Sequence, residues 1–132
     1  MNRQLAKIAH LKLNYQDRRI LILRLLVDYE NGSCQDVFGG LVLDEPIKDD
    51  DGKFLYRQGS AFGCEMIRLL LDVLKIDDLS EGTGKYIHVL GEGEGLGFKP
   101  KGIETLHVDG DQKKIIFSEV LVNMTNKGED YE

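Results

Sequence analysis

The sequence has few cysteines and lacks the long apolar segments of secreted and membrane proteins. Its two cysteines, Cys34 and Cys64, are too few for the disulfide scaffold of a small secreted protein. Both lie in apolar stretches, which predicts an interior position for each. No segment approaches the roughly 20 apolar residues of a membrane span, and the N-terminal MNRQLAKIAHLKLN has no apolar run typical of a signal peptide. These absences predict a cytoplasmic protein with no membrane contact.

An excess of basic residues is also missing. The chain has 17 Lys and Arg against 23 Asp and Glu, a net charge of −6, which disfavours direct binding to a nucleic-acid backbone. The acidic residues concentrate in DEPIKDDDG, which begins at Asp44, and in the C-terminal NKGEDYE. Each segment is either a solvated loop that keeps the protein soluble or part of an acidic face that meets a basic partner.

The composition fits a single globular domain. A chain of 132 residues with 42% hydrophobic and 30% charged residues leaves little room for a second core. At this size the buried surface is large enough for stability without a metal or a disulfide. We therefore expect one α+β domain over residues 1–122, an acidic and flexible C-terminal tail over residues 123–132, and no cofactor.

Alternation and turn signals predict a series of antiparallel strands. Polar and apolar residues alternate from Ile8 to Tyr15, whereas Ile20 to Val27 is almost wholly apolar and predicts a central strand covered on both faces. Asn31-Gly32 is a common hairpin turn, and Cys34 to Leu43 returns as a third strand. Further strands are predicted at 85–90, 102–108 and 114–122, the last two joined by Asp109-Gly110.

A long loop and a helix lie between the two groups of strands. Pro46 and Asp51-Gly52 predict a loop from Asp44 to Gly59, with room for a small hairpin at its tip. Ser60 then has the position of a helix N-cap, followed by apolar residues at helical spacing. The predicted fold is α+β: an antiparallel sheet of about six strands with one long helix packed on a face. The second face of the central strand must then be covered by a loop or by a second copy of the chain.

Motifs that suggest chemistry do not have the spacing their chemistry requires. KDDDGK would place Ile47 and Gln58 at ligand positions of a calcium loop where carboxylates are needed. GTGK lacks the helix of a phosphate loop, and GEGEGLG never gives the dinucleotide spacing. His10, His88 and His107 form no local metal pair and fit half-exposed strand faces. We therefore predict no catalytic residues, no metal and no enzymatic activity.

Two aromatic residues beside glycines raise a structural question. Gly39-Gly40 is expected to bend the third strand after Phe38, and Gly63 falls in the first helical turn, where it costs about 1 kcal/mol relative to alanine. The helix start and the bent strand therefore either pack together, with a small residue against an aromatic ring, or leave a pocket for an anionic ligand. The residues predicted to line that pocket are Gln35, Phe38, Gly39, Gly40, Ser60, Phe62 and Gly63.

A resemblance to a known protein family is carried by two segments, GSCQDVFGGLVLDEP and GSAFGCEMIRLLLDVLKIDDLSEGTGKYIHV. Their order of FGG..LD, G(S/T)AFG, a helix and a GKY strand resembles a family of small phage and prophage proteins, over about residues 28–90. The resemblance implies a setting rather than a reaction, because accessory proteins of mobile elements often bind host components. At Leu41 the sequence departs from the pattern, which usually has an aromatic residue there.

Two hypotheses of function follow. The first is a non-enzymatic phage or prophage protein, located in the bacterial cytoplasm, that binds a host protein or complex, such as an anti-CRISPR-like inhibitor of host defence. Its predicted partner-binding residues are Asp44, Glu45, Asp49, Asp50 and Asp51. The alternative is a protein that binds or sequesters a small molecule, for example a nucleotide signal, in the predicted pocket.

Overall fold

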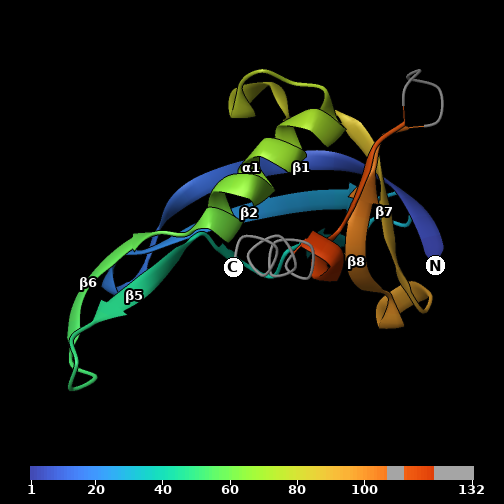
Figure 1. The fold of residues 1–132 in the computed structure, drawn as a ribbon. Helices are drawn as coiled ribbons and strands as arrows, with labels where there is room; N and C mark the ends of the chain where they lie inside the picture. The colour runs from blue at the N-terminus through green and yellow to red at the C-terminus, as the bar shows by residue number, and fades with distance from the viewer. Residues whose placement is uncertain (107–111, 121–132) are drawn as a thin grey trace.

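The computed structural model describes residues 1–106 and 112–120 as a curved sheet with a helix across one face and a hairpin that extends from one end (Figure 1). The strands are β1 (Asn2–Gln16), β2 (Ile20–Tyr29), β3 (Cys34–Asp36), β4 (Leu41–Val42), β5 (Asp44–Lys48), β6 (Phe54–Gly59), β7 (Tyr86–Glu92), β8 (Lys99–Glu104) and β9 (Lys114–Ile116). The helix α1 spans Ala61–Leu74, and single 3-10 turns occur at η1 (Asp17–Arg19), η2 (Leu79–Glu81) and η3 (Gly95–Gly97).

Within the described residues, the main sheet has seven strands, and every pairing is antiparallel. Its order is β3-β2-β1-β7-β8-β9, and β4 also pairs with β2, next to β3. The predicted α+β fold with a sheet of about six strands is thereby confirmed. β1 begins at Asn2, earlier than the alternation from Ile8 indicated, because its first residues pair with β7.

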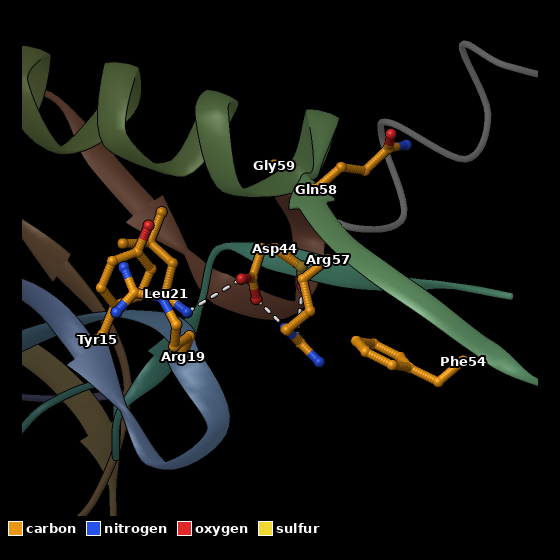
Figure 2. A pocket seen from close by; sticks show the side chains of 8 residues that line it. All are labelled: Tyr15, Arg19, Leu21, Asp44, Phe54, Arg57, Gln58 and Gly59. Atoms are coloured by element: carbon orange, nitrogen blue, oxygen red, sulfur yellow. Dashed lines mark hydrogen bonds and ion pairs between the residues drawn. The ribbon is translucent and has the colours of Figure 1, made fainter.

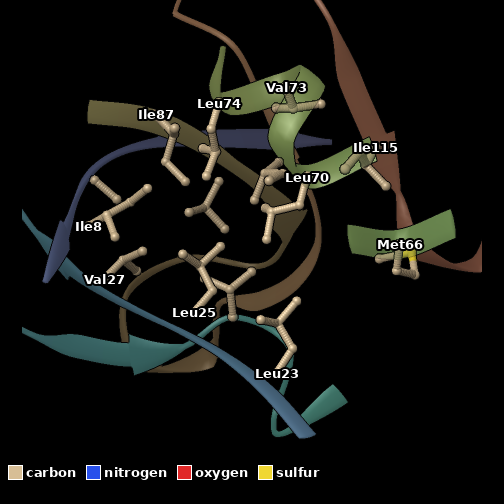
Figure 3. Close-up of a cluster of buried hydrophobic side chains, with 14 of the residues drawn as sticks. Ile8, Leu23, Leu25, Val27, Met66, Leu70, Val73, Leu74, Ile87 and Ile115 are labelled. Atoms are coloured by element: carbon tan, nitrogen blue, oxygen red, sulfur yellow. The ribbon is translucent and has the colours of Figure 1, made fainter. Parts of the chain in front are cut away.

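The core lies between the sheet and α1 (Figure 3). The strands present alternate residues to the helix, as period-two side-chain direction requires. The helix buries one stripe against them at three- and four-residue spacing, as expected for an amphipathic helix. The largest side chains of this core with less than 2% exposure are Ile8, Leu23, Leu25, Met66, Leu70, Leu74, Ile87, Ile103, Val27 and Val89.

The helix is shorter than predicted. α1 has 14 residues, an ordinary length of about four turns rather than one long helix. Its start matches the sequence signal, because the Ser60 hydroxyl accepts a hydrogen bond from the Gly63 N–H at 2.9 Å. It ends where Lys75 takes a left-handed conformation with φ 56°, and the Lys75 N–H bonds back to the Asp72 carbonyl.

Two sequence predictions are wrong, and others concern residues that the structure does not describe. The strand predicted over 114–122 ends at Ile116, and residues 117–120 are helical. The turn lets the Phe117 ring meet Phe38 edge-on at a centroid distance of 4.8 Å. Cys34 and Cys64 are exposed rather than interior, because each occupies a solvent-facing position of its element. His107, the Asp109-Gly110 turn and the tail over 123–132 lie outside the described residues.

The central strand is covered on its helix side and largely covered on the other. On that second face Ile22 is only 1% exposed, and Ile20 and Leu26 are half-buried. The same face carries the ion pair between Arg3 and the buried Glu104, whose nitrogen and oxygen atoms lie 2.8 Å apart. A covering second copy of the chain stays a prediction.

Candidate functional site

The segment predicted as a long loop is a hairpin along its whole length. Among the described strands, β5 and β6 pair only with each other, in a register that places Asp44 opposite Gly59 and Pro46 opposite Arg57. Figure 1 shows this hairpin projecting away from the sheet and α1. We call residues 44–59 the β5–β6 arm. The small hairpin considered for the loop tip was therefore the right structure, although it is much longer than expected.

The arm's tip is built around Asp49. Its Oδ1 accepts hydrogen bonds from the N–H groups of Asp51 and Lys53, both at 2.9 Å. This is the turn-forming use of an aspartate side chain, and Gly52 completes the turn with φ 82°. Asp49 is thus occupied in holding the turn, whereas the carboxylates of Asp50 and Asp51 are exposed.

Large apolar side chains are exposed next to this tip. Phe54, Leu55 and Tyr56 follow one another on β6 and are 55%, 54% and 54% exposed. Successive strand residues point to opposite faces, so both faces of the arm carry apolar surface. An isolated two-stranded hairpin gains little stability from such residues, and exposed apolar patches mark interaction sites.

The base of the arm is fixed to the sheet by a buried carboxylate. Asp44 Oδ1 lies 2.7 Å from an Arg57 guanidinium nitrogen, and its Oδ2 accepts the Leu21 N–H at 3.1 Å. Only 7% of the Asp44 side chain is exposed. The hydrogen bond from Arg57, helped by the one from Leu21, lowers the pKa of Asp44, and Asp44 in turn raises the pKa of Arg57. Asp44 therefore anchors the arm, while the neighbouring Glu45 is exposed.

A cavity of about 400 Å³ opens beside this ion pair (Figure 2). We call it the base cavity; its lining residues are Tyr15, Arg19, Leu21, Asp44, Phe54, Arg57, Gln58 and Gly59. The Arg19 guanidinium lies over the Tyr15 ring, 4.1 Å from its centroid. In Figure 2, Tyr15 and Arg19 lie on one side of the Asp44–Arg57 pair and the Phe54 ring lies on the other.

Two features of the arginines of the base cavity are unusual. Arg19 has φ 61°, a left-handed conformation that costs a residue with a side chain roughly 1–2 kcal/mol. Arg57 is 19% exposed in its side chain, and its buried Nε makes no hydrogen bond to any described residue. Strained and incompletely bonded groups concentrate at binding sites.

The residues predicted to line a pocket around the glycines have several structural roles. Gly39 and Gly40 have φ 66° and 85° and form the bend between β3 and β4, so the predicted bend after Phe38 is confirmed. Gln35 instead accepts a hydrogen bond at 2.6 Å from the hydroxyl of Tyr29, whose pKa burial raises to about 12. Phe38 packs on Phe117, as described above.

The remaining predicted pocket residues start the helix and have internal partners. The Ser60 hydroxyl donates to the Leu43 carbonyl at 2.9 Å, and it also accepts the Gly63 N–H. Phe62 is half-buried against the core. A Cβ on Gly63 would overlap the Leu43 backbone, with its Cα only 2.6 Å away. The close approach that the glycine permits is therefore to a backbone, not to an aromatic ring.

The base cavity was missed from the sequence, because its residues were divided between two predicted strands, the turn that joins them and the loop predicted over 44–59. The available signal for a strand was the enrichment in aromatic residues at Phe54 and Tyr56, because aromatic residues favour strands. The predicted acidic residues do lie on one arm, but they separate into an anchor, a turn residue and exposed carboxylates. The spacing of these residues in the sequence does not show which carboxylate has which of these roles.

The described residues offer few other sites for chemistry. His10 is exposed and His88 is half-buried near Glu104, with 3.8 Å between Nδ1 and the carboxylate. Within residues 1–106 and 112–120, no three or more His, Cys, Asp or Glu side chains are grouped so that they could hold a metal ion. No helix in the same ranges is long and apolar enough to cross a membrane.

Comparison with known proteins identifies no relative: no protein-family model matches the chain, and neither a curated protein nor a solved structure is detectably similar to it.

Proposed function

We propose that the protein is a non-enzymatic binding protein that engages a partner protein through the β5–β6 arm. The observation that carries this proposal is the run of Phe54, Leu55 and Tyr56, each more than half exposed. They lie on a hairpin that projects from the main sheet and α1, which together we call the body. Aromatic and large apolar side chains are the usual anchors of protein interfaces. They do little for the stability of a free hairpin, so their exposure is best explained by binding.

The exposed side chains of the arm indicate what kind of partner surface it would bind. Exposed apolar side chains on β6 suit an apolar groove, and the exposed carboxylates of Asp50 and Asp51 suit lysines or arginines at one end of that groove. Complementary charge mainly speeds association and excludes wrong partners, whereas the buried anchors supply most of the affinity. We therefore assign affinity to β6 and selectivity to the tip.

We further propose that this partner is a bacterial host protein, as the motif resemblance of residues 28–90 to small phage and prophage proteins implies. Inhibition of a host defence complex, in the manner of an anti-CRISPR protein, is the narrower form of the proposal. It requires that the arm occupy a surface which the complex needs for its own activity. An acidic protein of net charge −6 is suited to surfaces that otherwise bind nucleic acid.

Affinity capture from a bacterial lysate tests the proposal with matched variants. Leu55→Ser combined with Tyr56→Ser removes apolar surface from the arm, and Tyr86→Ser on β7 removes a side chain of similar exposure, 49%, from the body. We expect a partner that the wild type and Tyr86→Ser capture equally and the arm variant captures at least about tenfold less, as for loss of an interface anchor. Equal capture by the arm variant would reject the arm as the binding surface.

Charge reversal at the tip gives a second, smaller effect. Asp50→Lys with Asp51→Lys leaves the turn intact, whereas reversal at Asp49 would remove the acceptor of two backbone hydrogen bonds. We expect slower association and a weaker dependence of binding on salt. Unchanged association kinetics would limit the role of the acidic residues to solubility.

A further inference from the structure

The base cavity contains a set of groups that protein binding by the arm does not use. It brings two guanidinium groups, from η1 and from β6, next to the single carboxylate of Asp44. The charge of the lining side chains is thus +2 from Arg19 and Arg57 and −1 from Asp44, or +1, in a chain whose net charge is −6. A positive cavity in an acidic protein selects an anionic ligand.

The arrangement of the arginines suits a phosphate group. Arg19 stacks on Tyr15, which fixes the plane of its guanidinium and leaves the N–H groups at its edge to donate. Arg57 is oriented by Asp44, which is itself held by the Leu21 N–H. Guanidinium groups with a fixed plane bind phosphate oxygens through paired hydrogen bonds.

The other side of the cavity suits a planar aromatic group. The Phe54 ring is 55% exposed and borders the cavity on the side away from Tyr15 (Figure 2). Gln58 also borders the cavity, but its side chain points away from Arg57 and Phe54, and its amide donates to Glu45 Oε1 at 3.4 Å (Figure 2). The volume of about 400 Å³ lies within the range of small-molecule pockets.

We propose that the base cavity binds a mononucleotide, with its phosphate on Arg19 and Arg57 and its base stacked on Phe54. This ligand combines the anionic and the flat apolar chemistry that the cavity offers. The left-handed backbone at Arg19 fits this role, because it holds the side chain over Tyr15 at a cost in stability that binding explains. The cavity shares Phe54 with the proposed protein-binding surface of the arm, whereas Arg19 and Arg57 belong to the cavity and Leu55 and Tyr56 do not line it.

Isothermal titration of the full chain with four 5′-mononucleotides, the matching nucleosides and inorganic phosphate tests the ligand chemistry. We expect at least one mononucleotide to bind about tenfold or more tightly than either its nucleoside or phosphate alone, because only the nucleotide engages both halves of the cavity. Absence of mononucleotide binding would overturn the proposal. Phosphate binding as tight as nucleotide binding would overturn it too, because the cavity would then be a simple oxyanion site.

Variants locate the binding. Arg19→Gly removes the guanidinium while relieving the left-handed strain, so the fold is retained and nucleotide affinity should fall at least about tenfold. Phe54→Ala should also lower the affinity for the nucleotide about tenfold and leave the affinity for phosphate unchanged. Arg68→Gln, at an arginine on α1 with a 68% exposed side chain, is the control and should bind as the wild type does. Full affinity in Arg19→Gly would place any binding elsewhere and reject the site.

Protein binding by the arm and nucleotide binding in the base cavity can be rejected separately. The Leu55→Ser and Tyr56→Ser variant changes residues that do not line the base cavity, so it should lose the partner protein and keep the nucleotide. Arg19→Gly should do the reverse. Loss of both ligands in either variant would show that the arm and the cavity are one site and would overturn the assignment of nucleotide binding to a separate cavity.

Discussion

Leu70 and Leu55 are the same residue type, 15 positions apart, and the fold treats them in opposite ways. Leu70 on α1 is 0% exposed, and Leu55 on the β5–β6 arm is 54% exposed. Burial of a leucine contributes about 1.5–3 kcal/mol to stability, whereas an exposed leucine contributes little. The comparison shows that the apolar side chains of the body stabilise the fold and that those of the arm remain available for another molecule.

The largest expected effect tests this division directly. Leu70→Ala should lower the free energy of unfolding by about 2–5 kcal/mol, because it removes apolar contacts and leaves a cavity beneath α1. Leu55→Ala should change it by less than about 0.5 kcal/mol. Urea denaturation followed by circular dichroism measures both. An equal loss in Leu55→Ala would mean that the arm is buried in solution, for instance against a second copy of the chain.

The next largest effect is expected where the start of α1 packs on the residue before the arm, at Gly63 and Leu43. A Cβ at position 63 would overlap the Leu43 backbone, where neither partner can rotate away. We expect Gly63→Ala to destabilise the protein by about 1–3 kcal/mol, even though alanine ordinarily favours a helix by about 1 kcal/mol. Thermal unfolding measures this difference.

Gly59→Ala is the matched control at the last residue of the arm. No atom lies within 4 Å of a Cβ built at Gly59, and its φ is not positive. Its unfolding free energy should stay within about 0.5 kcal/mol of the wild type. Destabilisation by Gly59→Ala but not by Gly63→Ala would show that the helix start has room and that the arm base does not.

The body was largely predictable from the sequence because its signals are local. Ser60 as a cap, the helical spacing after it and the bend at Gly39-Gly40 each depend on neighbouring residues. The arm was not, because a segment rich in aspartate with one proline has the composition of a loop. Asp44 and Arg57 are 13 residues apart, and only the register of β5 with β6 brings them together.

The base cavity depends on a longer-range contact still. Arg19 lies in the turn between β1 and β2, and it reaches the cavity because the Leu21 N–H binds the Asp44 side chain. Nothing in the sequence near Arg19 indicates a left-handed backbone, since that conformation is rare for residues other than glycine, asparagine and aspartate. Exposure, the property on which the arm proposal depends, is likewise set by the whole fold.

The smallest expected effect concerns the pH dependence of the arm's anchor. The pKa of Asp44 is lowered in the folded protein, so its ion pair stabilises the fold fully above the unfolded value of about 4. That stabilisation is lost as the pH falls through the lower folded pKa. Asp44→Asn should therefore be less stable than the wild type by about 1 kcal/mol at neutral pH.

The difference between Asp44→Asn and the wild type should close in acid, because a protonated Asp44 also lacks the charge that pairs with Arg57. Urea denaturation at a series of pH values from about 7 down to about 2 follows this convergence. Asp50→Asn is the control, since Asp50 is exposed at the tip and should leave the curve unchanged. A constant difference down to the lowest pH would mean that Asp44 stabilises the arm by its shape and hydrogen bonding rather than by its charge.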